Sequence, residues 1–279
     1  MNPQSTPRRA AAPASDGASP RRDAAVSGMP RALAADAPLA TARPNRPRAR
    51  SVLPRASNAS AMIFPTLCVF DLDACFWTEE MYTLRDVVDP AKNVRGSLGP
   101  DVGEGVVGAV SGRHVIRIHP GALRAMQAFA RGECGTMRMA AASSADTPLA
   151  TRIGRSALDQ LEILPGLTAR ATFAIGWPEG FEGNLQIGRS PPLSSDKSAT
   201  HFPILRRETG APYDEMLFFD DCGWEDHCER VARRCVEASS GLGPVTVRTP
   251  RGCRVDEYAR GLALYDARAR KISSVAVEP

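Results

Sequence analysis

The chain has 279 residues, of which 43% are hydrophobic and 24% are charged, a composition typical of a soluble globular protein. No apolar run approaches the roughly 18 residues that a membrane-spanning helix needs, so we expect no membrane partner. The net charge of +4 comes from the first 61 residues, which hold ten arginines and three acids, whereas the rest holds 25 basic and 28 acidic residues. This slightly acidic body shows no basic face for nucleic acid.

Residues 1–61 differ in kind from the rest of the chain. They are rich in Ala, Pro, Arg and Ser and contain no aromatic residue. Such a segment buries too little apolar surface to offset its ordering entropy, so we expect a disordered leader. Its Arg-rich, acid-poor composition is typical of a transit peptide to the chloroplast or mitochondrion; the alternative is a low-complexity tail on an intracellular, cytoplasmic protein. Residues 62–279 are then the folded domain.

Strands and helices are predicted to alternate through this domain. Residues 62–70 form a short apolar run with β-branched and aromatic side chains, as in a strand buried on both faces. Further strands are predicted at 114–121, 136–144, 215–221 and 245–249, and helices at 122–132, 146–164, 197–209 and 225–238. The alternation indicates βαβ units, and hence an α/β fold with a mostly parallel sheet and helices on both faces.

Two stretches fit this alternation poorly. Residues 92–113 are rich in glycine and are predicted to form a flap or hairpin, and residues 165–195, rich in Gly and Pro, are predicted to be a long surface insertion. The seven cysteines are odd in number and scattered. Their spacing matches no zinc-binding pair, which favours reduced thiols.

Polar side chains close three of the predicted strands. They are Asp71 and Asp73 after the first, Ser143 and Ser144 after the one at 136–144, and Asp220 and Asp221 after the one at 215–221, while Lys197 begins a predicted helix. Ligands of parallel sheets bind beyond the carboxyl ends of the strands, so we expect these groups to converge. Each has a plain structural alternative: an Asp turn, a Ser N-cap or a surface lysine.

The convergence of these groups indicates phosphoryl chemistry. Four carboxylates at one edge would repel each other, and Mg²⁺, which favours oxygen ligands and phosphate, would relieve that repulsion. Lys197 and Ser143 could hold phosphate oxygens. Asp71 is then a candidate nucleophile, because carboxylates form aspartyl-phosphates, and Asp73 is a candidate general acid and base.

The same residues resemble the four motifs of the haloacid dehalogenase superfamily. The stretch "VFDLDACFW" (69–77) is similar to the first motif, "AAASS" (140–144) to the second, Lys197 to the third and "FFDD" (218–221) to the fourth. The closer resemblance, over about residues 62–265, is to the magnesium-dependent phosphatase 1 family of small, cap-less phosphatases. It rests also on "DKSATHF" (196–202), "RRETGAP" (206–212) and "MLFFDD" (216–221).

This resemblance implies a three-layer Rossmann-like core with no cap or a minimal one, and Mg²⁺-dependent hydrolysis of phosphomonoesters through an aspartyl-phosphate. It implies that Asp71 is the nucleophile and a metal ligand, and that Asp73 is the acid/base and gives its carbonyl to the metal. Ser143 and Lys197 would bind phosphate. Asp220 and Asp221 would complete the metal site, with the direct ligand left open between them.

Three departures from that family put the substrate in question. Cys75 replaces its usual Thr, Ser144 replaces its usual Arg, and Cys222-Gly223-Trp224 follows the second acidic pair. We expect a monomer that acts on a small phosphomonoester or on phosphotyrosine. Two alternatives remain: a catalytically weak or inactive binding or regulatory protein of the same fold, and a phosphotransferase. His201, four residues after Lys197, is predicted to be structural.

Overall fold

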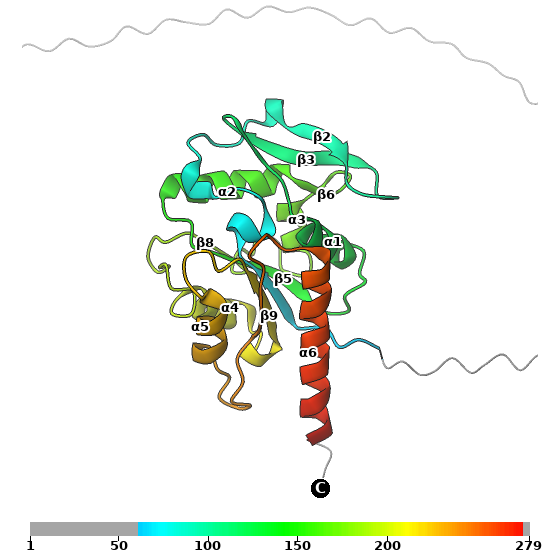
Figure 1. Cartoon of the computed structure of the whole chain (residues 1–279), viewed down its shortest axis with the longest axis vertical. Coiled ribbons are helices and arrows are strands. Elements are labelled where there is room, and N and C mark those ends of the chain that lie inside the picture. The colour runs from blue at the N-terminus through cyan, green and yellow to red at the C-terminus, as the bar shows by residue number, and fades with distance from the viewer. Residues whose placement is uncertain (1–60, 276–279) are drawn as a thin grey trace, which may run out of the picture. The chain divides into compact units, whose positions relative to one another are not determined.

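The computed structural model describes residues 61–275, with side chains through residue 273 (Figure 1). Its centre is a five-stranded sheet in the order β10-β9-β1-β5-β8, and all four neighbouring pairs are parallel. The strands are β1 (Leu67–Phe70), β5 (Arg138–Ser143), β8 (Leu185–Ile187), β9 (Met216–Asp220) and β10 (Val245–Arg248). The predicted α/β fold with a parallel sheet is therefore confirmed.

Alternate residues of the central strands face two separate hydrophobic layers. In β1, Cys68 and Phe70 belong to one core cluster, while Leu67 and Val69 belong to the other. Because β1 is buried along its whole length, its residues show no polar alternation. Phe70 also stacks on Phe219 of the neighbouring strand, with ring centroids 5.1 Å apart. The sheet is thus the middle layer of three.

Helices cover both faces of this sheet (Figure 1). Helices α4 (His201–Thr209) and α5 (His227–Arg234) pack on one face. The other face carries α1 (Pro120–Ala130), α2 (Pro148–Gln160), α3 (Ala169–Ala174) and α6 (Val255–Val275). Helix α2 begins at Pro148, two residues after the predicted start, and is capped by Thr147, whose hydroxyl accepts a hydrogen bond from Ala150 N. None of the described helices has an apolar stretch of the length that a bilayer crossing requires.

A second, antiparallel sheet lies apart from the central one. It joins β2 (Val94–Ser97), β3 (Glu104–Ser111) and β4 (His114–Ile116), so a hairpin forms inside residues 92–113 as predicted. The assignment of residues 114–121 to the alternating strand–helix pattern was wrong. Only 114–116 form a strand, and it pairs with β3, because the tight Ser111–His114 turn folds it straight back.

The segment 165–195 is more than a surface insertion. It carries α3, whose Phe173 is fully buried, and it supplies β8 as the edge strand of the central sheet. The helix predicted at 146–164 ends at Gln160, and the next residues form β6 (Glu162–Leu164), which pairs with β7 (Leu167–Thr168). The leader predicted at 1–61 lies outside the described residues, apart from Ala61.

Candidate active site

The carboxyl ends of three adjacent strands bring the predicted polar residues together. Asp71 follows β1 in the middle of the sheet, and its main-chain N–H donates to Phe219 O over 2.8 Å. Ser143 is the last residue of β5 on one side, and Asp220 is the last residue of β9 on the other. Because the three strands are parallel, these ends lie at one edge of the sheet.

The chain turns sharply after Asp71, and the turn determines the position of Asp73. Ala74 adopts a φ of +52°, which is unusual for a residue with a Cβ atom. The Asp73 carboxylate accepts hydrogen bonds from Met81 N at 3.0 Å and Trp77 Nε1 at 3.1 Å. Burial raises the pKa of Asp73 to about 7, although these two bonds oppose the rise. A carboxyl group held in this way can exchange a proton near neutral pH.

Lys197 lies between two buried carboxylates. Its Nζ is 2.7 Å from Asp71 Oδ1 and 2.6 Å from Asp220 Oδ2, and only 2% of its side chain is exposed. Burial alone would lower the pKa of Lys197, but the two carboxylates raise it above its usual value, so the ammonium stays charged. Lys197 does not begin α4 as predicted: it lies in the turn before the helix, where its carbonyl accepts from Phe202 N.

One ammonium does not balance the acids around it. One carboxylate oxygen from each of Asp71, Asp220 and Asp221 lies within 4.8 Å of the other two. Burial raises the pKa of Asp71, and the carboxylates of Asp220, Asp73 and Asp221 raise it further, against the effect of Lys197. Such a site favours a second cation. Oxygen-only ligands in this arrangement fit a hard divalent ion such as Mg²⁺.

The two acids of the pair after β9 have different surroundings. Asp220 is fully buried, and besides Lys197 it accepts a hydrogen bond from Cys222 N at 2.7 Å. Asp221 is half-buried and lines the cavity described below, where Asp220 does not. The difference follows from Cys222, whose φ of +56° turns the chain immediately after the pair. Asp221 therefore has the more accessible oxygens.

Ser143 is held at its main chain. Its carbonyl oxygen accepts hydrogen bonds from Gly188 N at 2.9 Å and from His201 Nε2 at 3.1 Å. The His201 ring is fully buried, and burial lowers its pKa to about 4, so the ring is neutral and Nε2 carries the proton it donates. The next residue, Ser144, donates its hydroxyl to Ser195 O at 3.3 Å.

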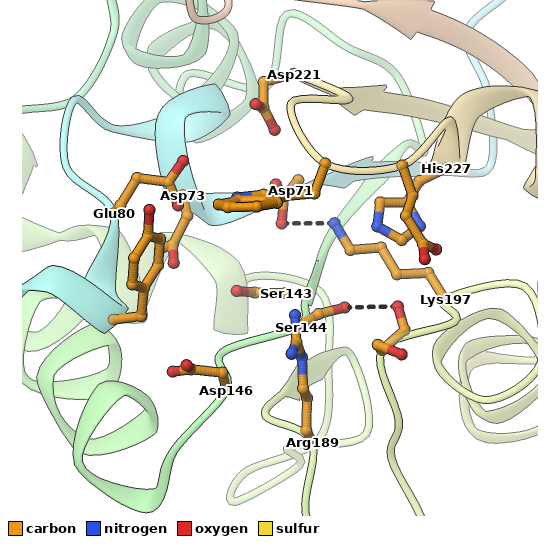
Figure 2. A pocket seen from close by; sticks show the side chains of 14 residues that line it. Asp71, Asp73, Glu80, Ser143, Ser144, Asp146, Arg189, Lys197, Asp221 and His227 are labelled. Carbon is orange, nitrogen blue, oxygen red and sulfur yellow. Dashed lines mark hydrogen bonds and ion pairs between the residues drawn. The ribbon is translucent and has the colours of Figure 1, made fainter.

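A cavity of about 510 Å³ opens above these groups (Figure 2). Asp71, Asp73, Ser143, Ser144, Lys197 and Asp221 line it, and no residue of the β2–β3–β4 sheet does. Sequence reasoning did not assign the other lining residues to the site: Glu80, Tyr82, Asp146, Arg189, Ser195, Trp224, Glu225 and His227. Most of these come from loops, and only their closeness to the strand-end motifs in sequence could have pointed to some of them.

Cys75 lies behind the site, outside the lining of the cavity. Its Sγ accepts a hydrogen bond from the Thr249 hydroxyl at 3.2 Å, and both residues are fully buried. Burial raises the pKa of the Cys75 thiol well above its usual value, so this thiol is neutral. The departure at position 75 therefore affects the support of the Asp71 turn. All seven cysteines lie in the described residues, and none forms a disulfide.

A comparison of sequences identifies the family of the chain. A family model described as Acid Phosphatase matches residues 63–268, which is most of the chain. The chain therefore belongs to this acid phosphatase family, a branch of the haloacid dehalogenase-like proteins. No curated protein matches the chain.

Proposed function

We propose that the protein is a Mg²⁺-dependent phosphomonoester hydrolase that acts through an aspartyl-phosphate on Asp71, like the magnesium-dependent phosphatase 1 family. Membership of an acid phosphatase family supports phosphatase activity in general. The observation that carries the finer proposal is the position of Asp71. Its carboxylate lines the cavity, is neutralised on one side by Lys197, and has Asp73 two residues away on the same turn.

The proposed reaction has two steps, each performed by one of these acids. In the first, an Asp71 oxygen attacks phosphorus while the bond to the ester oxygen breaks, and Asp73 donates a proton to that oxygen. In the second, Asp73 accepts a proton from water as the water attacks the aspartyl-phosphate. Inorganic phosphate leaves, and Asp71 is a carboxylate again. Met81 N and Trp77 Nε1 keep the Asp73 carboxyl oriented for both transfers.

The remaining site residues bind the phosphoryl group and the metal. Lys197 contributes a fixed positive charge, and the Ser143 hydroxyl contributes a hydrogen-bond donor. Asp71 and Asp221 are the proposed direct side-chain ligands of Mg²⁺, with the Asp73 carbonyl, while Asp220 holds Lys197 in place. When bound, Mg²⁺ supplies positive charge to the oxygens of the transferred group. Without Mg²⁺, the positive charge of Lys197 would not balance the carboxylates of the site.

The mouth of the cavity supports a phosphate ester with a planar leaving group. Trp224 is 77% exposed, and its ring packs edge-on against Tyr82 with centroids 6.3 Å apart. Exposed aromatic rings at a cavity bind flat apolar groups well. An aryl phosphate, including an exposed phosphotyrosine, is therefore the proposed substrate class, within the wider class of small phosphomonoesters. We propose that the chain acts as a monomer, without nucleic acid or membrane.

Hydrolysis of para-nitrophenyl phosphate tests this function. Wild type is expected to turn over with Mg²⁺ and to lose activity in EDTA, and Asp71→Asn should lose nearly all turnover. Because this variant also removes a buried partner of Lys197, its melting temperature should fall, and circular dichroism at the assay temperature checks that it is still folded. A phosphate-labelled protein, trapped by acid quench in wild type and missing in Asp71→Asn, would identify the intermediate. No turnover at any Mg²⁺ concentration would refute the proposal and favour a binding or regulatory protein of the same fold, for which the altered Cys222-Gly223-Trp224 segment is the support.

A further inference from the structure

The cavity lining contains more acids than cations. Among the described residues, its carboxylates come from Asp71, Asp73, Glu80, Asp146, Asp221 and Glu225, whereas its lysine and arginine side chains are Lys197 and Arg189 alone. Lys197 is already paired with Asp71 and Asp220. Glu225 is paired with Arg230 outside the cavity. A phosphate dianion that enters this cavity needs positive charge that is still available, and within the described residues the structure gives Arg189 no ion pair or hydrogen bond.

The backbone places Arg189 beside the end of β5. Arg189 directly follows Gly188, whose N–H donates to the carbonyl oxygen of Ser143. Gly188 has a φ of +129°, which residues with a Cβ atom rarely adopt, and a Cβ there would lie 3.1 Å from Thr151 Oγ1. This turn leads the chain out of β8 next to Ser143, and Figure 2 shows the Arg189 side chain rising toward Ser143 and Ser144.

A second contact fixes the far end of the same loop. The hydroxyl of Ser144 donates to Ser195 O, so residues 188–195 are tied to the end of β5 at both ends. Ser144 is the position where the sequence departs from an expected arginine. A short side chain there leaves room above Ser143, and its hydroxyl holds the loop that carries a different arginine. Ser144 thus holds one end of the loop that carries Arg189, a cation with no partner within the described residues.

We propose that Arg189 binds the phosphate group of the substrate, with its guanidinium donating to phosphoryl oxygens on the side of the cavity opposite the Asp220–Asp221 loop. The planar guanidinium can give two parallel N–H bonds to one phosphate, which a lysine cannot do. This inference rests on the proposed phosphatase function and adds a phosphate-binding residue to it. Arg189 acts in binding, so its removal affects substrate and phosphate affinity more than the chemical step.

The test compares Arg189→Gln with wild type, using inorganic phosphate as the probe. We expect the inhibition constant of phosphate and the KM for para-nitrophenyl phosphate to rise about 10- to 100-fold, as for the loss of a charge-assisted hydrogen-bond pair, with a smaller change in kcat. Arg189→Lys should lie between the two proteins. Arg251→Gln is the matched control, because Arg251 is also exposed and lies outside the cavity lining, and it should behave as wild type.

The outcomes separate this inference from the function on which it rests. If wild type turns over and Arg189→Gln keeps the phosphate inhibition constant and KM of Arg251→Gln, the role of Arg189 is refuted and the phosphatase stands. If wild type does not turn over, the phosphatase is refuted, and calorimetric titration of phosphate into the same variants with Mg²⁺ decides the role of Arg189. In that titration, the role of Arg189 would be refuted if phosphate bound Arg189→Gln and Arg251→Gln with equal affinity, or if it did not bind wild type. Melting temperatures, expected to be unchanged at this exposed position, exclude misfolding.

Discussion

The ammonium of Lys197 lies 2.6 Å from Asp220 Oδ2, in a contact from which water is nearly excluded. The same ammonium is 2.7 Å from Asp71, so one cation holds the ends of two neighbouring strands together. Removing one partner of a buried ion pair leaves the other charge without compensation, which costs far more than the pair contributes in net stability. A substitution of Lys197 therefore affects stability and activity together. The free energy of unfolding must be measured in addition to activity to tell the two effects apart.

Lys197→Met should lower the free energy of unfolding by about 3–5 kcal/mol at pH 7 without metal, since Asp71 and Asp220 then stay buried and unpaired. Urea denaturation followed by circular dichroism measures this loss. Lys92→Met is the matched control: Lys92 lies 3.1 Å from Asp89, but both side chains are largely exposed. The control should cost less than about 1 kcal/mol. Equal losses in the two variants would contradict the buried ion-pair argument.

Asp221→Asn and Asp220→Asn should have different effects, the first on the Mg²⁺ dependence of activity and the second on the free energy of unfolding. The proposed ligand Asp221 has accessible oxygens, so Asp221→Asn should raise the Mg²⁺ concentration for half-maximal activity by about tenfold or more, with little loss of stability. Asp220→Asn removes a buried partner of Lys197 and should lower the free energy of unfolding even without Mg²⁺. Metal titrations and urea denaturation of both variants measure the two effects. If Asp221→Asn needed the same Mg²⁺ concentration for half-maximal activity as wild type, Asp221 would not be a direct ligand.

The central sheet was predictable because its strands carry strong local signals. Leu67–Phe70 is a continuous apolar run followed by Asp71, and Met216–Asp220 is an apolar run that ends in an acid. A strand buried on both faces is expected to give such a continuous apolar run. Strand β8 was missed because it is three residues long and sits in a stretch rich in glycine. The pairing of β4 with β3 depends on a turn between them, and periodicity does not reveal which sheet a short strand joins.

The site was predictable to the extent that its residues follow strands in sequence. Asp71, Ser143 and Asp220 could be placed at one edge from the alternation of elements alone. Arg189 could not, because nothing in the sequence shows that the residue after β8 lies beside Ser143. Likewise, the different surroundings of Asp220 and Asp221 depend on the positive φ of Cys222, which residue type does not predict.

The buried, neutral His201 should lower the free energy of unfolding when the protein is mildly acidified. Its folded-state pKa is about 4, lowered first by burial and then by the Lys197 ammonium and His227, against hydrogen bonds to the carbonyls of Ser143 and Gly188. In the unfolded chain a histidine titrates near 6.5. Between these values only the unfolded state takes up the proton, so stability is full above about pH 6.5 and falls as the pH drops toward 4. His201 alone should contribute a loss of up to about 3 kcal/mol.

His201→Gln tests this contribution, because its amide can still donate to the Ser143 carbonyl but does not titrate. Urea denaturation of wild type and His201→Gln at pH 7 and pH 5 gives the change in the free energy of unfolding for each protein. Other groups titrate in this range in both proteins, so the difference between the two changes isolates His201. Wild type should lose more stability than the variant. An equal loss in both would mean that His201 is not buried in its neutral form.

Trp224 should contribute to substrate selection and little to stability. It is 77% exposed at the mouth of the cavity, where its ring packs edge-on against Tyr82, so its removal takes little buried surface from the fold. Trp224→Ala should raise KM for para-nitrophenyl phosphate about three- to tenfold, as expected for losing one aromatic contact of about 0.5–1.5 kcal/mol. KM for glycerol phosphate, which has no ring, should change little, and Trp224→Phe should keep most of the preference. Steady-state kinetics with both substrates measure the ratio. Equal changes in KM for the two esters would show that Trp224 does not recognise the leaving group.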